Sequence, residues 1–72
     1  MSLSRQEQLM LNHMERYGGI STRDAVRKYD IMRPQSRVND LRRKGYNILT
    51  EMKYRKRRDG TTVRWAYYKL VS

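Results

Sequence analysis

The hydrophobic spacing of this 72-residue chain changes once, near Tyr46, from a helical pattern to an alternating one. Before that point, apolar residues recur at intervals of three and four, which is typical of amphipathic helices. After it, every second residue from 46 to 54 is apolar, aromatic or β-branched, and Asp59-Gly60 then precedes a second extended stretch over residues 62–71. The sequence therefore predicts helices followed by one β-hairpin.

Local signals bound a first helix over residues 5–17. Ser4 followed three residues later by Glu7 is a capping-box pattern, and Gly18 ends the helix. Ile20, just beyond, is an isolated apolar residue that suits a strand of one or two residues. The inward stripe of this helix is expected to contain Met10, Met14 and Tyr17, with Leu9 and Leu11 beside it.

Two shorter helices are predicted next. Ser21 is the expected cap of a helix over residues 22–29. Pro34 suits the first position of a third helix over residues 34–44, and Gly45 fits the left-handed residue after its end. The residues that these two helices are expected to bury are Ala25, Val26, Tyr29, Val38 and Leu41.

The register of the hairpin depends on its turn. A two-residue turn at Asp59-Gly60 pairs residues whose numbers sum to 119, whereas a three-residue loop with Gly60 as a bulge shifts that sum to 120. We favour the second register, because it gives one inner face rich in aliphatic side chains. That face contains Ile48, Met52, Tyr68 and Leu70, and leaves Trp65 and Tyr67 outside.

The composition argues against several classes of function. The chain has no cysteine and one histidine, so no disulfide and no metal site are expected, and His13 is interpreted as packing at the edge of the core. The acidic residues form no evident acid–base pair, and no glycine-rich phosphate loop is present, so we expect no enzymatic activity and no cofactor. Without a signal-like N-terminus or a run of about 20 apolar residues, a cytoplasmic protein without a membrane partner is expected.

Positive charge is concentrated in the second part of the chain. Residues 31–72 carry 12 Lys and Arg against three acidic residues, whereas residues 1–30 carry five against four. A net charge of +10 is typical of proteins that bind nucleic acid, because neutralising phosphates releases counterions. The segregation of charge indicates that residues 31–72 provide the main binding surface.

The third predicted helix offers side chains that suit base recognition. With Val38 and Leu41 inward, the helix presents Arg and Asn on its outer face and Arg and Lys along one flank, while Gln35 and Arg42 lie nearer the rim of the core. Arg, Asn and Gln can make paired hydrogen bonds to guanine or adenine in a major groove. An ordinary solvated helix with an ion pair between Arg37 and Asp40 is the alternative. The candidate DNA-binding residues of this helix are Arg33, Gln35, Ser36, Arg37, Asn39, Asp40, Arg43 and Lys44.

The hairpin and the start of the second helix provide candidate phosphate contacts. Five of the six residues from 53 to 58 are basic, more than an edge strand needs to prevent aggregation. Such a tip can follow the DNA backbone or enter the minor groove. The hairpin candidates are Lys53, Arg55, Lys56, Arg57, Arg58 and Arg64. Backbone N–H groups at the helix start form a weaker phosphate site, for which simple capping is an equal alternative, at Ser21, Thr22 and Arg23.

Two runs of the sequence resemble the small helix-turn-helix domains common in tailed-phage and prophage genomes. Residues 19–25, together with the preceding Gly18, match their Gly-x-Ile-Thr/Ser opening. Residues 31–48 contain their Arg-Ile/Val-x-Asp-Leu-Arg-x-x-Gly-Tyr block, and Tyr68-Lys69-Leu70 matches their closing strand. The resemblance covers nearly the whole chain. It implies a winged helix with DNA-binding activity in a bacterial or phage-infected cytoplasm, and places Arg33, Arg37 and Arg43 on the recognition helix. The hairpin is longer and more basic than in that pattern.

We therefore expect residues 1–72 to form one mainly α winged helix-turn-helix domain, with three helices and a small C-terminal β-hairpin as its wing. Its expected function is non-enzymatic binding of double-stranded DNA, as a phage or prophage transcriptional regulator or accessory factor. Two alternatives remain: an adaptor for a host protein, which exposed Trp65 and Tyr67 would favour, and binding of RNA or single strands, on which those aromatics would stack. A homodimer or larger assembly would supply a second recognition helix.

Overall fold

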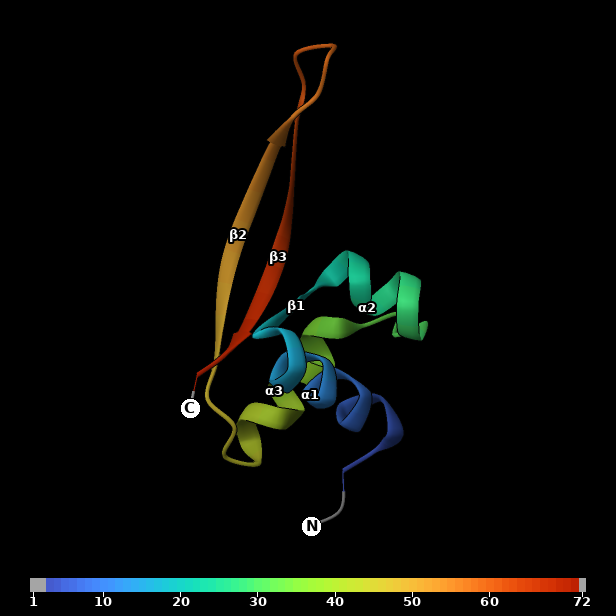
Figure 1. The fold of residues 1–72 in the computed structure, drawn as a ribbon, viewed down its shortest axis with the longest axis vertical. Coiled ribbons are helices and arrows are strands. Elements are labelled where there is room, and N and C mark those ends of the chain that lie inside the picture. Colours follow the sequence, from blue (N-terminus) through green and yellow to red (C-terminus); the bar gives the residue numbers. More distant parts are fainter. Residues whose placement is uncertain (1–2, 72) are drawn as a thin grey trace.

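The computed structural model describes residues 3–71, and Figure 1 shows the arrangement of its elements. The bounds of the first two helices are as predicted, whereas the third ends one residue earlier because Lys44 is its C-cap. The predicted order of three helices and a terminal hairpin is confirmed. The elements are α1 (Arg5–Tyr17), β1 (Gly19–Ser21), α2 (Thr22–Tyr29), α3 (Pro34–Arg43), β2 (Ile48–Lys56) and β3 (Thr62–Leu70).

Local hydrogen bonds fix the helix ends. The Ser4 hydroxyl accepts from the Glu7 N–H, and the Glu7 carboxylate accepts from the Ser4 N–H, each at 3.2 Å, which completes the predicted capping box. The Ser21 hydroxyl caps α2 by accepting from the Asp24 N–H at 3.0 Å. Gly45 has a φ of +100°, a left-handed conformation that glycine adopts without strain after a helix.

The strands form one antiparallel sheet in the order β1-β3-β2. Both predicted hairpin registers are wrong, because paired residue numbers sum to 118, as in Ile48 with Leu70. Since 118 and 120 are both even, the two faces of the hairpin are still those of the favoured register. Tyr68 is accordingly buried among the helices, and Trp65 and Tyr67 lie on the opposite face.

The turn explains the error in register. The loop has three residues, as favoured, but it comprises residues 58–60 and begins one position earlier than assumed. The Arg57 N–H donates to the Thr61 carbonyl at 2.7 Å, and Gly60 takes a left-handed φ of +90°. The Asp59 carboxylate accepts from both the N–H and the hydroxyl of Thr61, at 2.9 and 2.6 Å. These bonds lower the pKa of Asp59 and hold the loop in its observed position.

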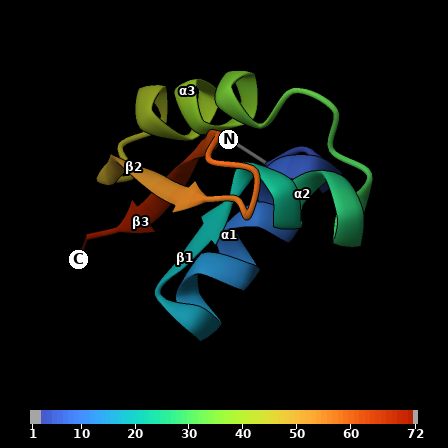
Figure 2. The same cartoon turned by 90° about the horizontal axis from the view of Figure 1, so that it is seen from above.

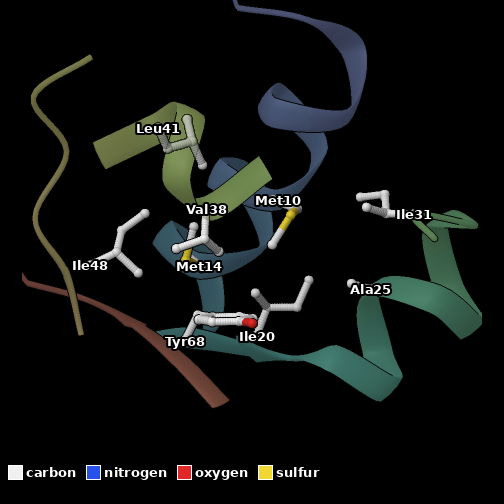
Figure 3. Packing of buried hydrophobic residues seen from close by; sticks show 9 residues of the cluster. All are labelled: Met10, Met14, Ile20, Ala25, Ile31, Val38, Leu41, Ile48 and Tyr68. Atoms are coloured by element: carbon white, nitrogen blue, oxygen red, sulfur yellow. The ribbon is translucent and has the colours of Figure 1, made fainter. Parts of the chain in front are cut away.

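The hydrophobic core lies between the three helices and the inner face of the sheet (Figure 3). Each helix contributes to it, as does the Ile31 side chain from the segment between α2 and α3. The largest of its fully buried side chains is Tyr68. The members of this core are Met10, Met14, Ile20, Ala25, Ile31, Val38, Leu41, Ile48 and Tyr68.

Several residues predicted to face inward do not. Tyr17 is 60% exposed at the last position of α1, and Val26 is 37% exposed on α2. Met52 is 47% exposed, because β2 and β3 continue beyond the helices that cover their lower part (Figure 1). Tyr29 is half-buried rather than buried.

The long hairpin gives the molecule an elongated shape of 47 × 24 × 20 Å. Seen from above in Figure 2, the hairpin tip points toward the viewer, α3 runs along one side of the molecule, and α2 lies next to α3. The part of the hairpin that projects is the part that carries its basic residues. Within residues 3–71, no helix has the length and apolar character that crossing a bilayer requires.

Candidate nucleic-acid interface

Helix α3 is held with one face in the core and the other in solvent. Val38 and Leu41 are fully buried, which confirms the predicted inward face. On the outer side, Gln35, Asn39 and Arg43 are exposed. Ser36 and Asp40 are half-buried, and Arg33 is exposed just before the helix begins.

Two amide side chains on the outer face of α3 are connected to the core. The Tyr68 hydroxyl donates to Oε1 of Gln35 at 2.8 Å, and Nε2 of Gln35 donates to Oδ1 of Asn39 at 3.1 Å. Burial raises the pKa of the Tyr68 hydroxyl, so this group stays protonated and able to donate. The sequence predicted Gln35 and Asn39 as site residues but interpreted Tyr68 only as packing.

The basic residues of α3 differ in their exposure and in whether an acidic side chain already pairs with them. Arg37 pairs with Asp40 at 3.2 Å, as the alternative interpretation expected, and its Nε atom is buried without a partner among the residues that the structure describes. The guanidinium of Arg43 lies 3.7 Å from the same carboxylate, but its side chain is 81% exposed. Arg43 is therefore the arginine of α3 with the better access to a ligand.

Lys44 is engaged inside the protein. Its ammonium lies 2.6 Å from Oε2 of Glu7, a residue only 4% exposed, and the contact joins the end of α3 to the start of α1. The hydrogen bond from Lys44 is the main reason that the pKa of Glu7 is lowered, against the opposing effect of burial. Lys44 thus positions α3 and has little freedom to contact a ligand.

Arg42 was predicted to lie near the rim of the core, with no function of its own. Its Nε atom donates to the Ile48 carbonyl at 3.0 Å, and its Nη2 atom donates to the Thr50 hydroxyl at 2.9 Å. Arg42 therefore joins α3 directly to the first residues of β2. This role could not be predicted from the residues of α3 alone, because both hydrogen-bond acceptors belong to β2.

Replacing Arg42 by methionine is expected to loosen the junction between α3 and β2. Methionine keeps much of the apolar stem but removes both hydrogen bonds, which we expect to cost about 1–2 kcal/mol of unfolding free energy. Amide hydrogen exchange should accelerate at the base of β2 and β3 more than in α1. The exposed Arg43→Met variant is the control, and equal exchange rates in the two variants would contradict this role for Arg42.

The register divides the basic residues of the hairpin between its two faces. Lys53 and Arg55 lie on the face of Trp65, whereas Lys56 and Arg64 lie on the opposite face. All of these basic side chains are exposed. Arg57 and Arg58 continue the charge into the tip. The sequence predicted one basic patch, and the structure shows a hairpin that is basic on both faces and at its end.

The start of α2 lies close to the hairpin. The Arg23 guanidinium lies 5.8 Å from the centroid of the Trp65 ring. Arg23 also lines a cleft with Val63 and the basic tip residues 55–58. Ser21 pairs with Tyr67 of β3, but it is buried and its hydroxyl is occupied by the α2 cap, so of the three weaker phosphate candidates Arg23 is the one whose exposed side chain lies beside the basic tip.

His13 lies apart from this surface. It is 6% exposed, and its Nδ1 atom lies 2.7 Å from the Tyr29 hydroxyl. Burial is the main cause of its lowered pKa. Within residues 3–71, no group of three or more His, Cys, Asp or Glu side chains is placed to hold a metal ion.

A helix-turn-helix built from α2 and α3, followed by a β-hairpin wing, defines a winged helix-turn-helix protein. The chain belongs to the family of winged helix-turn-helix domains, whose pattern it matches over residues 5–72. A comparison with curated proteins found no match. Domains of this family are typically non-enzymatic DNA-binding modules, so membership suggests DNA as a partner.

Proposed function

We propose that this protein binds double-stranded DNA, with α3 in the major groove and the wing on the backbone or in the adjacent minor groove. The observation that carries the proposal is the direct junction, through Arg42, between the exposed polar face of α3 and the basic wing. This junction ties the end of α3 to the base of the strand that continues into the basic wing.

The structure supports a division of roles among the candidates. Gln35, Asn39 and Arg43 are the exposed donors of α3, with Ser36 between them, and suit base edges. Arg37 is paired with Asp40 on the same helix, and Lys44 supports the orientation of α3 through its contact with Glu7 on α1. The side chains proposed for phosphate contact are Arg23, Lys53, Arg55, Lys56, Arg57, Arg58 and Arg64.

As part of the same proposal, the protein is a transcriptional regulator or accessory DNA-binding factor of a phage or prophage, acting in a bacterial cytoplasm. Its resemblance to phage domains supports this role. One α3 and one wing read a short site, so two copies on adjacent half-sites would raise specificity.

The adaptor and single-strand alternatives have less support. Exposure of Trp65 and Tyr67 would favour both alternatives, and these residues are half-buried. The exposed apolar residues of β2 do not form one patch, because Leu49 lies on the opposite face from Met52 and Tyr54.

Fluorescence anisotropy tests the proposal. A labelled random 20-base-pair duplex is titrated with the protein between about 50 and 200 mM salt, and the log–log slope should be steeper than about −3, at roughly −0.9 per phosphate contacted. Competition with single-stranded DNA and with RNA of the same length should be weaker than with duplex. Absence of duplex binding at 50 mM salt, or tighter binding of a single strand, would overturn the proposal.

A further inference from the structure

A chain of hydrogen bonds runs from the core to the outer surface of α3. It begins at Tyr68, which is 1% exposed, passes through the Gln35 amide, and ends at Asn39 on the exposed face. Both amides are in solvent, where a side chain normally rotates freely. Here the buried hydroxyl donates to the Oε1 end of the Gln35 amide, which leaves the Nε2 end to donate to Oδ1 of Asn39.

The last amide in this chain is left with a defined pair of free groups. Within residues 3–71, the Nδ2 group of Asn39 has no hydrogen-bond partner, and Oδ1 accepts only the bond from Gln35. Asn39 therefore offers two N–H donors beside one unused lone pair. In the major groove, adenine presents an acceptor at N7 beside a donor at N6, which matches this pair.

Other bases match less well. Guanine presents two acceptors, at N7 and O6, so that the Oδ1 atom of Asn39 would face another acceptor. Cytosine offers a donor alone at this edge, and thymine offers an acceptor beside a methyl group. The exposed Arg43, with several donors and no acceptor, is complementary to guanine instead.

We propose that Asn39 selects adenine at one position of the DNA site, and that Tyr68 is a positioning residue that orients Asn39 through Gln35. This inference rests on the proposed function, because it names the base that α3 reads. It gives Tyr68 a part in base recognition in addition to the packing of its ring in the core.

Base preference measured on duplexes tests the inference. The preferred sequence is first selected from a random 20-base-pair duplex pool, and affinities are then measured for the four base pairs at each position. At one position the wild-type protein should prefer adenine by about tenfold or more. The Asn39→Ala variant should lose that preference at that position only.

The positioning role has its own variants. Tyr68→Phe keeps the ring and removes the donor, so the adenine preference should fall at least about threefold, while affinity for random duplex and its salt slope stay unchanged. Gln35→Glu is an exposed change that removes the N–H donated to Asn39, and it should lower the preference similarly even if Tyr68→Phe folds poorly. Tyr29→Phe is the matched control, because it also removes one tyrosine hydroxyl with an internal partner, and it should leave base preference intact.

Each outcome is decisive. An adenine preference that survives Asn39→Ala, or a protein that binds duplex without any sequence preference, overturns the assignment of Asn39 and leaves the proposed function standing. Loss of preference in Asn39→Ala together with full preference in both Tyr68→Phe and Gln35→Glu overturns the positioning role. Failure of the wild-type protein to bind duplex overturns the proposed function itself.

Discussion

Replacing Glu7 by alanine is expected to remove most of the free energy of folding. The carboxylate accepts hydrogen bonds from the Ser4 N–H and from the Lys44 ammonium, and it is almost fully buried. Its removal breaks the capping box and leaves the half-buried Lys44 ammonium without its partner, and the two losses together cost about 3 kcal/mol. A domain of this size has a net stability of roughly 3–5 kcal/mol, so a substantial part of the variant should be unfolded at 25 °C.

Urea unfolding followed by circular dichroism measures this effect. The matched control is Glu15→Ala, which removes an exposed carboxylate from the same helix with the same change in net charge. The urea midpoint should fall much further for Glu7→Ala than for Glu15→Ala. Equal midpoints would show that the contact between Glu7 and Lys44 contributes no more than a surface charge.

Glu7 should also affect how steeply the free energy of unfolding falls at acid pH. The pKa of Glu7 is lowered in the folded protein, mainly by the hydrogen bond from Lys44, so the unfolded chain binds the proton more tightly. The stabilisation is therefore complete well above the unfolded value of 4.5 and is lost as the pH falls through the lower, folded value. Unfolding measured between about pH 6 and 2 should lose stability less steeply in Glu7→Gln than in the wild type.

Glu7 also shows what the sequence can and cannot predict. Its capping role was predictable, because Ser4 and Glu7 are three residues apart and the bonds between them are local. Its pairing with Lys44 was not, because 37 residues separate the two and only the packing of α1 against α3 brings them together. The same reasoning explains why helix ends were predicted well and the hydrogen bonds of Arg42 were missed.

The hairpin illustrates a second limit. Alternation predicted its faces, but the register depended on where the loop begins, which the bonds between Asp59 and Thr61 determine. The burial of Met52 was wrong for another reason: alternation identifies a face, not how far along the strand the helices cover it. In the candidate site, residue types indicated Gln35, Asn39 and Arg43, and the ion pair of Arg37 with Asp40 was foreseen as a local alternative, whereas the partner of Lys44 required the tertiary structure.

Replacing Arg57 and Arg58 together by alanine should weaken binding to every duplex by a similar factor. Both lie at the tip of the wing, and if each neutralises one phosphate, the log–log salt slope should flatten by about two units and the affinity should fall roughly 50-fold at 0.1 M salt. Base preference should not change, because the residues proposed to read bases lie on α3. Anisotropy titrations of several duplexes between about 50 and 200 mM salt measure all three quantities.

Loss of net charge alone would also weaken binding, and a second double variant separates the two causes. Arg5→Ala with Arg16→Ala removes the same two charges from exposed positions on α1, away from the wing tip in Figure 1. Long-range charge should affect both double variants alike, whereas direct phosphate contact should flatten the slope only in the wing variant, because counterions are released where phosphates are neutralised. Equal salt slopes in the two double variants would show that the wing contributes only to the overall electrostatic field of the protein. A changed base preference in the wing variant would instead mean that the tip reads sequence, and that the division of roles between α3 and the wing is wrong.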